Sequence, residues 1–387
     1  MAVAAVLLLA ACLRAPLTAV GPLMERVGTE TGLGPSALGL LGALPVVGFG
    51  VGSALVQRPA ARHGLERVIA AALALLTGAV VLRSLALPGA LWVGTAALGV
   101  AIAAGNVLAP AVIKREQPQR IALVTACFTA VMSTTAATAS GLAVPLSDAL
   151  GGGWRLPLGL FAVVVAGVAA VWVVRAARTP AQTAPTVGSG EGASPPAVRM
   201  WGSGSAWSIS VFMGLQSTVF YTLITWLPTV EASLGLDPAA AGWHLFVYQV
   251  VGMAAGFVLT TLMRGRTDLR GLGVAISLCS VLAVTGLYLL PGAAVLWVVL
   301  AAVGSGSALV LALSLFGLRT AHPRHTAQLS AMAQTVGYGI AAGGPLLAGW
   351  VGGTFGWELV LLLAAAVAAA QTLVVLGAAR PGVILDR

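Results

Sequence analysis

The chain has 387 residues, of which 59% are hydrophobic and only 8% are charged, and its formal net charge is +9. Soluble domains carry about 25% charged residues, so this composition excludes an ordinary soluble protein and indicates that lipid is the solvent. A membrane-spanning helix needs about 20 apolar residues, and the chain has room for about twelve of them with their loops.

Continuous apolar runs follow one another along the chain, unlike the short alternating segments of barrel strands. A stretch rich in Pro, Gly, Ser and Thr separates two sets of six runs and has the composition of a linker. We therefore predict an all-α polytopic membrane protein with an N-terminal six-helix bundle (1–175), a linker (176–205) and a C-terminal six-helix bundle (206–387). The predicted spans are 3–24, 36–56, 66–86, 90–113, 120–146 and 154–175, then 206–230, 239–263, 269–290, 293–317, 327–350 and 357–378.

Basic residues are distributed unequally between alternate loops. One set of loops holds 16 of the 20 lysines and arginines, whereas the opposite set holds only Arg26, Arg83 and Arg155. By the positive-inside rule, this asymmetry predicts that both termini and the linker are cytoplasmic, in a multi-pass protein of the inner membrane. The positive net charge is then a topology signal. It does not indicate nucleic-acid binding, because no loop is a long basic tract with interleaved aromatic residues.

The two halves of the chain resemble each other. Residues 32–39 are similar to residues 235–242, and Gly153-Trp154 is similar to Gly356-Trp357, in both cases at an offset of 203. Two matches at one offset indicate a duplicated six-helix unit and hence two pseudo-symmetric bundles. Parallel repeats of this kind place the ligand site between the halves, near the middle of the membrane.

Arg14 lies about halfway along the first apolar run. An arginine at that depth carries an insertion cost of roughly 2.5–3.5 kcal/mol on translocon scales, so such residues usually have a function. All eleven acidic residues of the sequence fall in predicted loops or at span ends. A central cation therefore favours an anionic or electron-rich ligand held by charge-assisted hydrogen bonds. The alternative is an arginine that bonds backbone carbonyls where Pro16 breaks the helix.

Other polar and aromatic side chains inside the predicted spans are candidates for binding the same ligand, because amides and hydroxyls donate hydrogen bonds and aromatic rings stack on planar groups. Gln334 and Tyr338 are four residues apart and share one helix face. For the glutamines, bonding between helices is as good an interpretation as lining a site. The candidate substrate-binding residues are Arg14, Thr18, Asn106, Gln216, Tyr221, Trp226, Gln249, Gln334 and Tyr338.

His244 lies inside the eighth predicted span and is a possible proton site, since an imidazole titrates near neutral pH. A neutral histidine with a structural role near the interface remains the alternative. No metal, nucleotide or nucleophile motif is present, and we expect no cofactor. The segment Gly304-Ser305-Gly306-Ser307 lacks the lysine of a phosphate loop and is interpreted as a helix-packing segment.

Four motifs in order resemble one family of transporters. The chain resembles the major facilitator superfamily and, within it, the cyanate transporter / 2-nitroimidazole transporter family. The resemblance implies a twelve-helix alternating-access transporter of small anions or small nitrogen heterocycles. Two positions depart from the family pattern, with Cys12 where the family has Asn, and Pro16 displaced from the position after Arg14. The motifs are Leu13-Arg14 with Thr18-Ala19-Val20-Gly21-Pro22-Leu23, residues 105–115, Gly214-Leu215-Gln216-Ser217 with Phe220-Tyr221 and Trp226-Leu227-Pro228, and Met332-Ala333-Gln334 with Gly337-Tyr338.

These observations predict a secondary transporter, not an enzyme. Its partners are expected to be a small anionic or electron-rich solute and the membrane lipids, with no nucleic acid, and we expect a monomer. One alternative is a broad-specificity drug exporter of the same superfamily, although the few aromatic residues and the absence of acidic residues inside the spans disfavour cationic drugs. A polytopic membrane enzyme or a solute sensor is the more remote alternative, because no constellation for catalysis is seen.

Overall fold

The computed structural model of the chain describes residues 2–117, 119–151, 153–179, 200–321 and 323–384. Over these residues the chain is helical and contains no strand. Eleven helical segments of the described part are long and apolar enough to cross a membrane. The predicted all-α, multi-pass architecture is thus confirmed.

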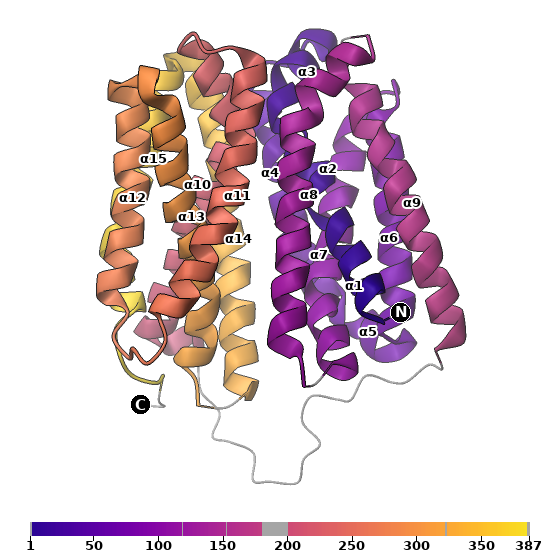
Figure 1. Cartoon of the computed structure of the whole chain (residues 1–387), viewed down its shortest axis with the longest axis vertical. Coiled ribbons are helices and arrows are strands. Elements are labelled where there is room, and N and C mark those ends of the chain that lie inside the picture. The colour runs from indigo at the N-terminus through magenta and orange to yellow at the C-terminus, as the bar shows by residue number, and fades with distance from the viewer. Residues whose placement is uncertain (1, 118, 152, 180–199, 322, 385–387) are drawn as a thin grey trace. The chain divides into compact units, whose positions relative to one another are not determined.

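The first half of the chain consists of long helices that run side by side in Figure 1, where they are coloured indigo to magenta. The first span is interrupted twice and the others are continuous. The helices are α1 (Ala2–Leu13), α2 (Ala15–Thr18), the 3-10 turn η1 (Gly21–Leu23), α3 (Met24–Thr31), α4 (Pro35–Leu55), α5 (Gln57–His63), α6 (Leu65–Ser84), α7 (Ala90–Glu116), α8 (Ile121–Ala149) and α9 (Arg155–Arg178).

The second half repeats this order without the interruptions. Its first span, α10, is one helix of 30 residues. The elements are η2 (Met200–Gly202), α10 (Gly204–Ser233), α11 (Pro238–Leu262), α12 (Arg270–Leu289), η3 (Pro291–Ala293), α13 (Ala294–Leu318), α14 (Pro323–Phe355) and α15 (Trp357–Ala378).

The internal repeat is visible in the helix starts. Helix α4 begins at Pro35 and α11 begins at Pro238, again 203 residues apart. Proline is favoured in the first turn of a helix, where its missing N–H would have no intrahelical partner. The duplication inferred from the sequence therefore corresponds to a duplicated helix start.

The described chain forms two compact units. Residues Pro35–Gly39, at the start of α4, belong to the second unit, and residues Asp237–Phe246, at the start of α11, belong to the first. Of the predicted linker 176–205, residues 180–199 lie outside the described residues.

Helix α14 stands at the place of the predicted span 327–350 and is 33 residues long. It is absent from the eleven apolar segments of the described chain, and both polar side chains and glycines lower the hydropathy of its sequence. Gln328, Ser330, Gln334, Thr335 and Tyr338 all fall within its first half. The least apolar long helix is thus one that carries two of the candidate binding residues.

Candidate functional site

The first span is broken at Arg14. Helix α1 ends at Leu13, and Arg14 itself has non-helical φ and ψ angles of −122° and −35°. Its carbonyl accepts hydrogen bonds from the N–H groups of Leu17 and Thr18, both at 3.0 Å, and so starts α2. Pro16 has no N–H to donate to the helix before it, which explains why the break occurs here. The Arg14 side chain is half-buried.

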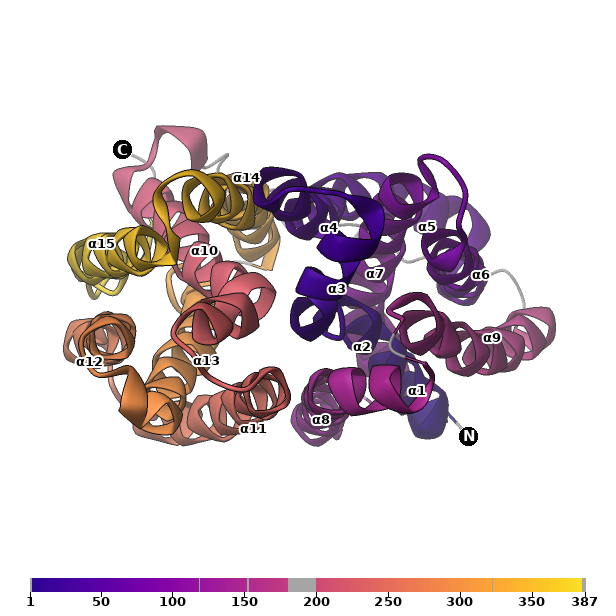
Figure 2. The same ribbon diagram turned by 90° about the horizontal axis from the view of Figure 1, so that it is seen from above.

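Thr18 fixes the short helix α2 to α8. The Thr18 side chain is 0% exposed, and its hydroxyl donates to the Ala136 carbonyl at 2.9 Å. The Ser140 hydroxyl on α8 is within donating distance of two carbonyls, that of Thr18 at 3.2 Å and that of Ala136 at 3.0 Å. Figure 2 shows α8 and α9 beside α1 and α2, and contacts join all four helices. In this arrangement the Thr18 hydroxyl hydrogen-bonds a neighbouring helix of the same bundle.

Arg83 is a residue whose place the sequence interpretation missed. The loop count puts it among the few charges on the outer side, but its side chain is only 1% exposed in the last turn of α6. Its Nη1 donates to the Pro16 carbonyl at 2.8 Å. A buried arginine therefore bonds the backbone two residues after Arg14. The sequence did contain an indication that Arg83 is buried, since this residue falls inside the predicted apolar run 66–86.

Helix α7 contacts the end of α1 at Gly105, the residue that precedes Asn106. A Cβ added at Gly105 on α7 would lie 2.4 Å from Leu13 Cδ2, so α1 and α7 approach closely at the point where α1 ends. Asn106 is exposed, and it follows Gly105 as Arg14 follows Leu13. Arg14 and Asn106 thus each follow, in the chain, one of the two residues at which α1 and α7 meet.

His244 is half-buried in α11 and belongs to the part of this helix that groups with the first unit. It follows Trp243, whose ring packs edge-on against Phe246 at 5.4 Å between centroids. A Cβ at Gly141 on α8 would lie 3.2 Å from the Trp243 ring. The histidine is therefore placed next to an aromatic contact with α8.

Gln216 and Tyr221 lie on α10 in the second unit. Gln216 is buried, and its Nε2 donates to the Ser217 hydroxyl at 2.7 Å and to the Met213 carbonyl at 3.1 Å. Phe220 joins α10 to α11, with its ring 5.2 Å from that of Tyr221 and 6.0 Å from that of Tyr248. Gln249, the next residue on α11, is also buried.

Gln334 and Tyr338 lie on α14, which packs extensively on α10. Both are half-buried, and Gln334 Nε2 donates to the Ser330 hydroxyl one turn earlier at 2.8 Å. The structure thus brings Gln216, Tyr221, Gln334 and Tyr338 together on one pair of contacting helices, with Gln249 on α11 beside α10. Arg14, Thr18, Asn106 and His244 belong to the other unit.

Trp226 fastens the same two helices nearer the end of α10. Its indole N–H donates to the Pro345 carbonyl at 2.9 Å, and its ring lies 4.8 Å from that of Trp357. The side chain is only 1% exposed. In this arrangement the hydrogen-bonding group of Trp226 serves the packing of α10 on α14.

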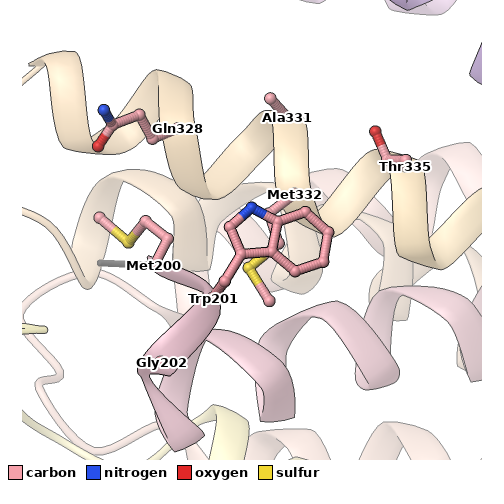
Figure 3. A pocket seen from close by; sticks show the side chains of 7 residues that line it. All are labelled: Met200, Trp201, Gly202, Gln328, Ala331, Met332 and Thr335. Atoms are coloured by element: carbon pink, nitrogen blue, oxygen red, sulfur yellow. The ribbon is translucent and has the colours of Figure 1, made fainter. Parts of the chain in front are cut away.

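A cavity of about 690 Å³ opens in the second unit between η2 and the first half of α14. Figure 3 shows the Trp201 ring over Met332, with Gln328 and Thr335 on the α14 side of the cavity. The Trp201 side chain is 61% exposed. An indole face with an amide and a hydroxyl nearby is suited to a planar polar molecule. This cavity includes none of the residues expected from the sequence to bind the solute.

A charged cluster joins the ends of three helices of the first unit. Glu66 at the start of α6 is buried and pairs with Arg115 at the end of α7, whose Nη1 donates to Glu66 Oε2 at 3.3 Å. Arg175 near the end of α9 lies 3.6 Å from Glu66 and also pairs with Glu116. No group of three or more potential metal-ligating residues occurs in the part of the chain that the structure describes.

The broken span, the charged side chain at the break and the duplicated helical units are features of a membrane transporter. Comparison with known proteins defines the class. The chain belongs to the Major Facilitator Superfamily, whose family model matches residues 6–344. It is therefore a transporter and not an enzyme.

Three relatives align over most of their length. The chain is 35% identical to the uncharacterized transporter YycB of Bacillus subtilis, over 97% of this chain and 91% of that protein. It is 33% identical to the 2-nitroimidazole transporter of Escherichia coli, over 93% of this chain and 90% of the relative. It is also 30% identical to the cyanate transport protein CynX of Escherichia coli, with coverage of 87% and 86%.

Among solved structures, the fold is similar to that of a D-xylose–proton symporter, with a TM-score of 0.75 and coverage of 96% of both chains. The sequence identity is only 14%, so this likeness concerns the fold alone. The fold predicted from the sequence and the family resemblance are both confirmed.

Proposed function

We propose that the chain carries a small anionic or electron-rich nitrogen-containing solute, similar to cyanate or a nitroimidazole, across the cytoplasmic membrane by alternating access. The observation that carries the proposal is the break at Arg14. A half-buried guanidinium stands at the interruption of a spanning helix, and α7, which carries the exposed Asn106, contacts the end of α1. Interrupted helices at membrane depth are typical of solute sites in transporters.

The chemistry of the residues supports this class of solute. A guanidinium binds carboxylate-like and other electron-rich groups through charge-assisted, often paired hydrogen bonds. Gln216, Gln334 and Tyr338 on α10 and α14 supply amide and phenol groups, and Tyr221 and Tyr338 supply ring faces for a planar solute. The names of the two Escherichia coli relatives point to the same small, nitrogen-containing solutes.

The orientation is part of the proposal. We propose that residues 1–175 and 206–387 form the two bundles that alternate around the site and that residues 176–205 connect them on the cytoplasmic side. The excess of basic residues in one set of loops supports cytoplasmic termini. His244 is proposed as a proton site of the transport cycle. We also propose that the protein works as a monomer.

Flux measurements test the proposal. Purified protein in proteoliposomes is expected to transport cyanate or 2-nitroimidazole, and Arg14→Ala is expected to abolish this flux while the protein stays folded. The cation tetraphenylphosphonium serves as the comparison solute. Flux of tetraphenylphosphonium without flux of either proposed solute would favour the drug exporter and contradict the proposal.

The same vesicles test whether solute transport is coupled to proton movement. If His244 carries protons, an imposed pH gradient changes the flux of the wild type and not that of His244→Gln. Equal responses of the two proteins would contradict a proton site at this residue.

A further inference from the structure

Arg83 makes an unusual contact for a charged side chain in a membrane helix. It is 1% exposed, and its Nη1 donates to the carbonyl of Pro16 at 2.8 Å. Its Nε and Nη2 have no hydrogen-bond partner among the described residues. Burying an arginine side chain costs free energy. A buried arginine that bonds a single backbone carbonyl therefore indicates that this carbonyl needs a hydrogen-bond donor.

The Pro16 carbonyl needs a donor because the helix does not continue. In an uninterrupted helix it would accept from the N–H of Val20. Here α2 ends at Thr18, and the Val20 N–H instead approaches the Leu17 carbonyl at 3.4 Å. In lipid, backbone groups released by a break must be bonded by the protein itself. Arg83 supplies that bond from another helix.

The helix that carries Arg83 is firmly packed at this level. A Cβ added at Gly94 on α7 would lie 2.5 Å from the Arg83 backbone nitrogen and 2.7 Å from the Ala79 carbonyl oxygen, so α6 and α7 touch through their backbones. Helix α6 also packs extensively on α9. The donor to Pro16 therefore extends from a closely packed group of helices.

The broken segment is thus held from two sides. Arg83 on α6 bonds the carbonyl of Pro16, the Ala136 carbonyl on α8 accepts from the Thr18 hydroxyl, and the Ser140 hydroxyl on α8 lies 3.2 Å from the Thr18 carbonyl oxygen. Arg14 directly precedes this held segment, and its own carbonyl begins α2. The orientation of the Arg14 backbone, and with it the origin of its side chain, depends on these bonds.

We propose that Arg83 is a positioning residue for Arg14: by bonding the Pro16 carbonyl it fixes the break in the first span and so the place from which the Arg14 guanidinium reaches the solute. This role rests on the function proposed above for Arg14. It concerns the geometry of the broken segment, which is measurable without any solute.

The first test measures the accessibility of position 14. In a background with Cys12→Ala, Cys127→Ser and Cys279→Ala, a single cysteine replaces Arg14, and its labelling rate with the thiol reagent MTSET is compared between Arg83 and Arg83→Met. Loss of one hydrogen bond from a charged donor is expected to change this rate by about tenfold or more. Arg83→Lys keeps a donor and is expected to restore the rate at least in part.

A cysteine at Arg58 is the control, since this exposed residue lies on α5 and outside the broken segment. Its labelling rate is expected to be the same with Arg83 and with Arg83→Met. An equal change at both positions, or no change at either, would overturn the proposal. Arg83→Leu, which also lacks a donor, is the second variant if the methionine protein does not fold. Failure of all three variants to fold would make Arg83 part of the framework of the bundle, and the positioning role would be rejected.

The second test separates positioning from stability during transport. With cyanate or 2-nitroimidazole as the probe, Arg83→Met is expected to raise KM by about tenfold or more while the maximal flux per folded molecule changes less. A lower amount of folded protein with an unchanged KM would contradict the proposal. If the wild type transports neither probe, the proposed solute class fails, and the labelling comparison still decides the role of Arg83.

Discussion

Gly306 lies where two helices of the second unit touch through their backbones. It is part of the segment Gly304-Ser305-Gly306-Ser307 in α13 and faces Gly252 on α11. A Cβ added at Gly306 would lie 2.1 Å from the Gly252 carbonyl oxygen and 2.5 Å from its Cα. Neither atom belongs to a side chain that can rotate away. Gly306→Ala therefore has to push α11 and α13 apart by about 1 Å before ordinary contact is restored.

The cost of this separation is of the order of overpacking a core, about 1–3 kcal/mol. It works against a gain of up to about 1 kcal/mol, because alanine is a better helix former than glycine. Thermal unfolding of the purified protein in detergent measures the balance. A loss of 1 kcal/mol lowers Tm by about 2–4 °C for a unit of roughly this size. We expect Gly306→Ala to lower Tm by several degrees.

Gly78 on α6 provides the matched control. It is exposed in the middle of a helix, and a Cβ added there would meet no atom within 4 Å. Gly78→Ala is expected to leave Tm unchanged or to raise it. If Gly306→Ala unfolds at or above the Tm of Gly78→Ala, the close approach of α11 and α13 does not constrain the fold, and the packing argument is refuted.

Three further substitutions test the hydrogen bonds and ion pairs by thermal unfolding. Trp226→Phe removes the donor to the buried Pro345 carbonyl and is expected to cost about 1–3 kcal/mol, and an unchanged Tm would show that this bond does not contribute. Glu66→Gln removes one of the two carboxylates of its cluster and leaves Glu116 to pair with Arg115 and Arg175, so it is expected to cost about 1–3 kcal/mol. Asp268→Asn is expected to have little effect, because the carboxylate and its partner are both exposed and such pairs contribute little. The Arg270 hydrogen bond lowers the pKa of Asp268 to about 2, so any stabilisation by Asp268 is present above about pH 4 and disappears as the pH falls toward 2. A wild-type minus Asp268→Asn difference in Tm that already changes between pH 7 and pH 5 would contradict this assignment.

The fold was predictable from the sequence because long apolar runs report directly on burial in lipid. The apolar runs, the starts of α4 and α11 at Pro35 and Pro238, and the duplicated unit all follow from patterns that lie along the chain. The break near Arg14 was also within reach, since Pro16 cannot donate to a preceding carbonyl. The composition of α14, which has several polar residues in its first half, explains why it is the least apolar of the long helices.

Contacts between residues that are far apart in the sequence could not be predicted from the sequence. Counting Arg83 as a loop charge follows from its place near the end of an apolar run, and only the packing of α6 against the broken span shows that it bonds Pro16. Thr18 and Trp226 were expected to bind solute because they are polar groups inside spans. In the structure their donors bond the backbone carbonyls of Ala136 and Pro345. No local sequence pattern predicts those partners.

The binding constant of a proposed solute for the wild type and for Arg14→Ala tests the central claim most directly. Titration calorimetry with sodium cyanate and with 2-nitroimidazole is expected to show binding of at least one of them to the wild type. Binding is expected to be unchanged in Arg58→Ala, which removes an exposed arginine of α5. Loss of a charge-assisted hydrogen bond is expected to weaken binding by about 10–100-fold in Arg14→Ala. A folded Arg14→Ala protein that binds the solute with the wild-type Kd would contradict the account.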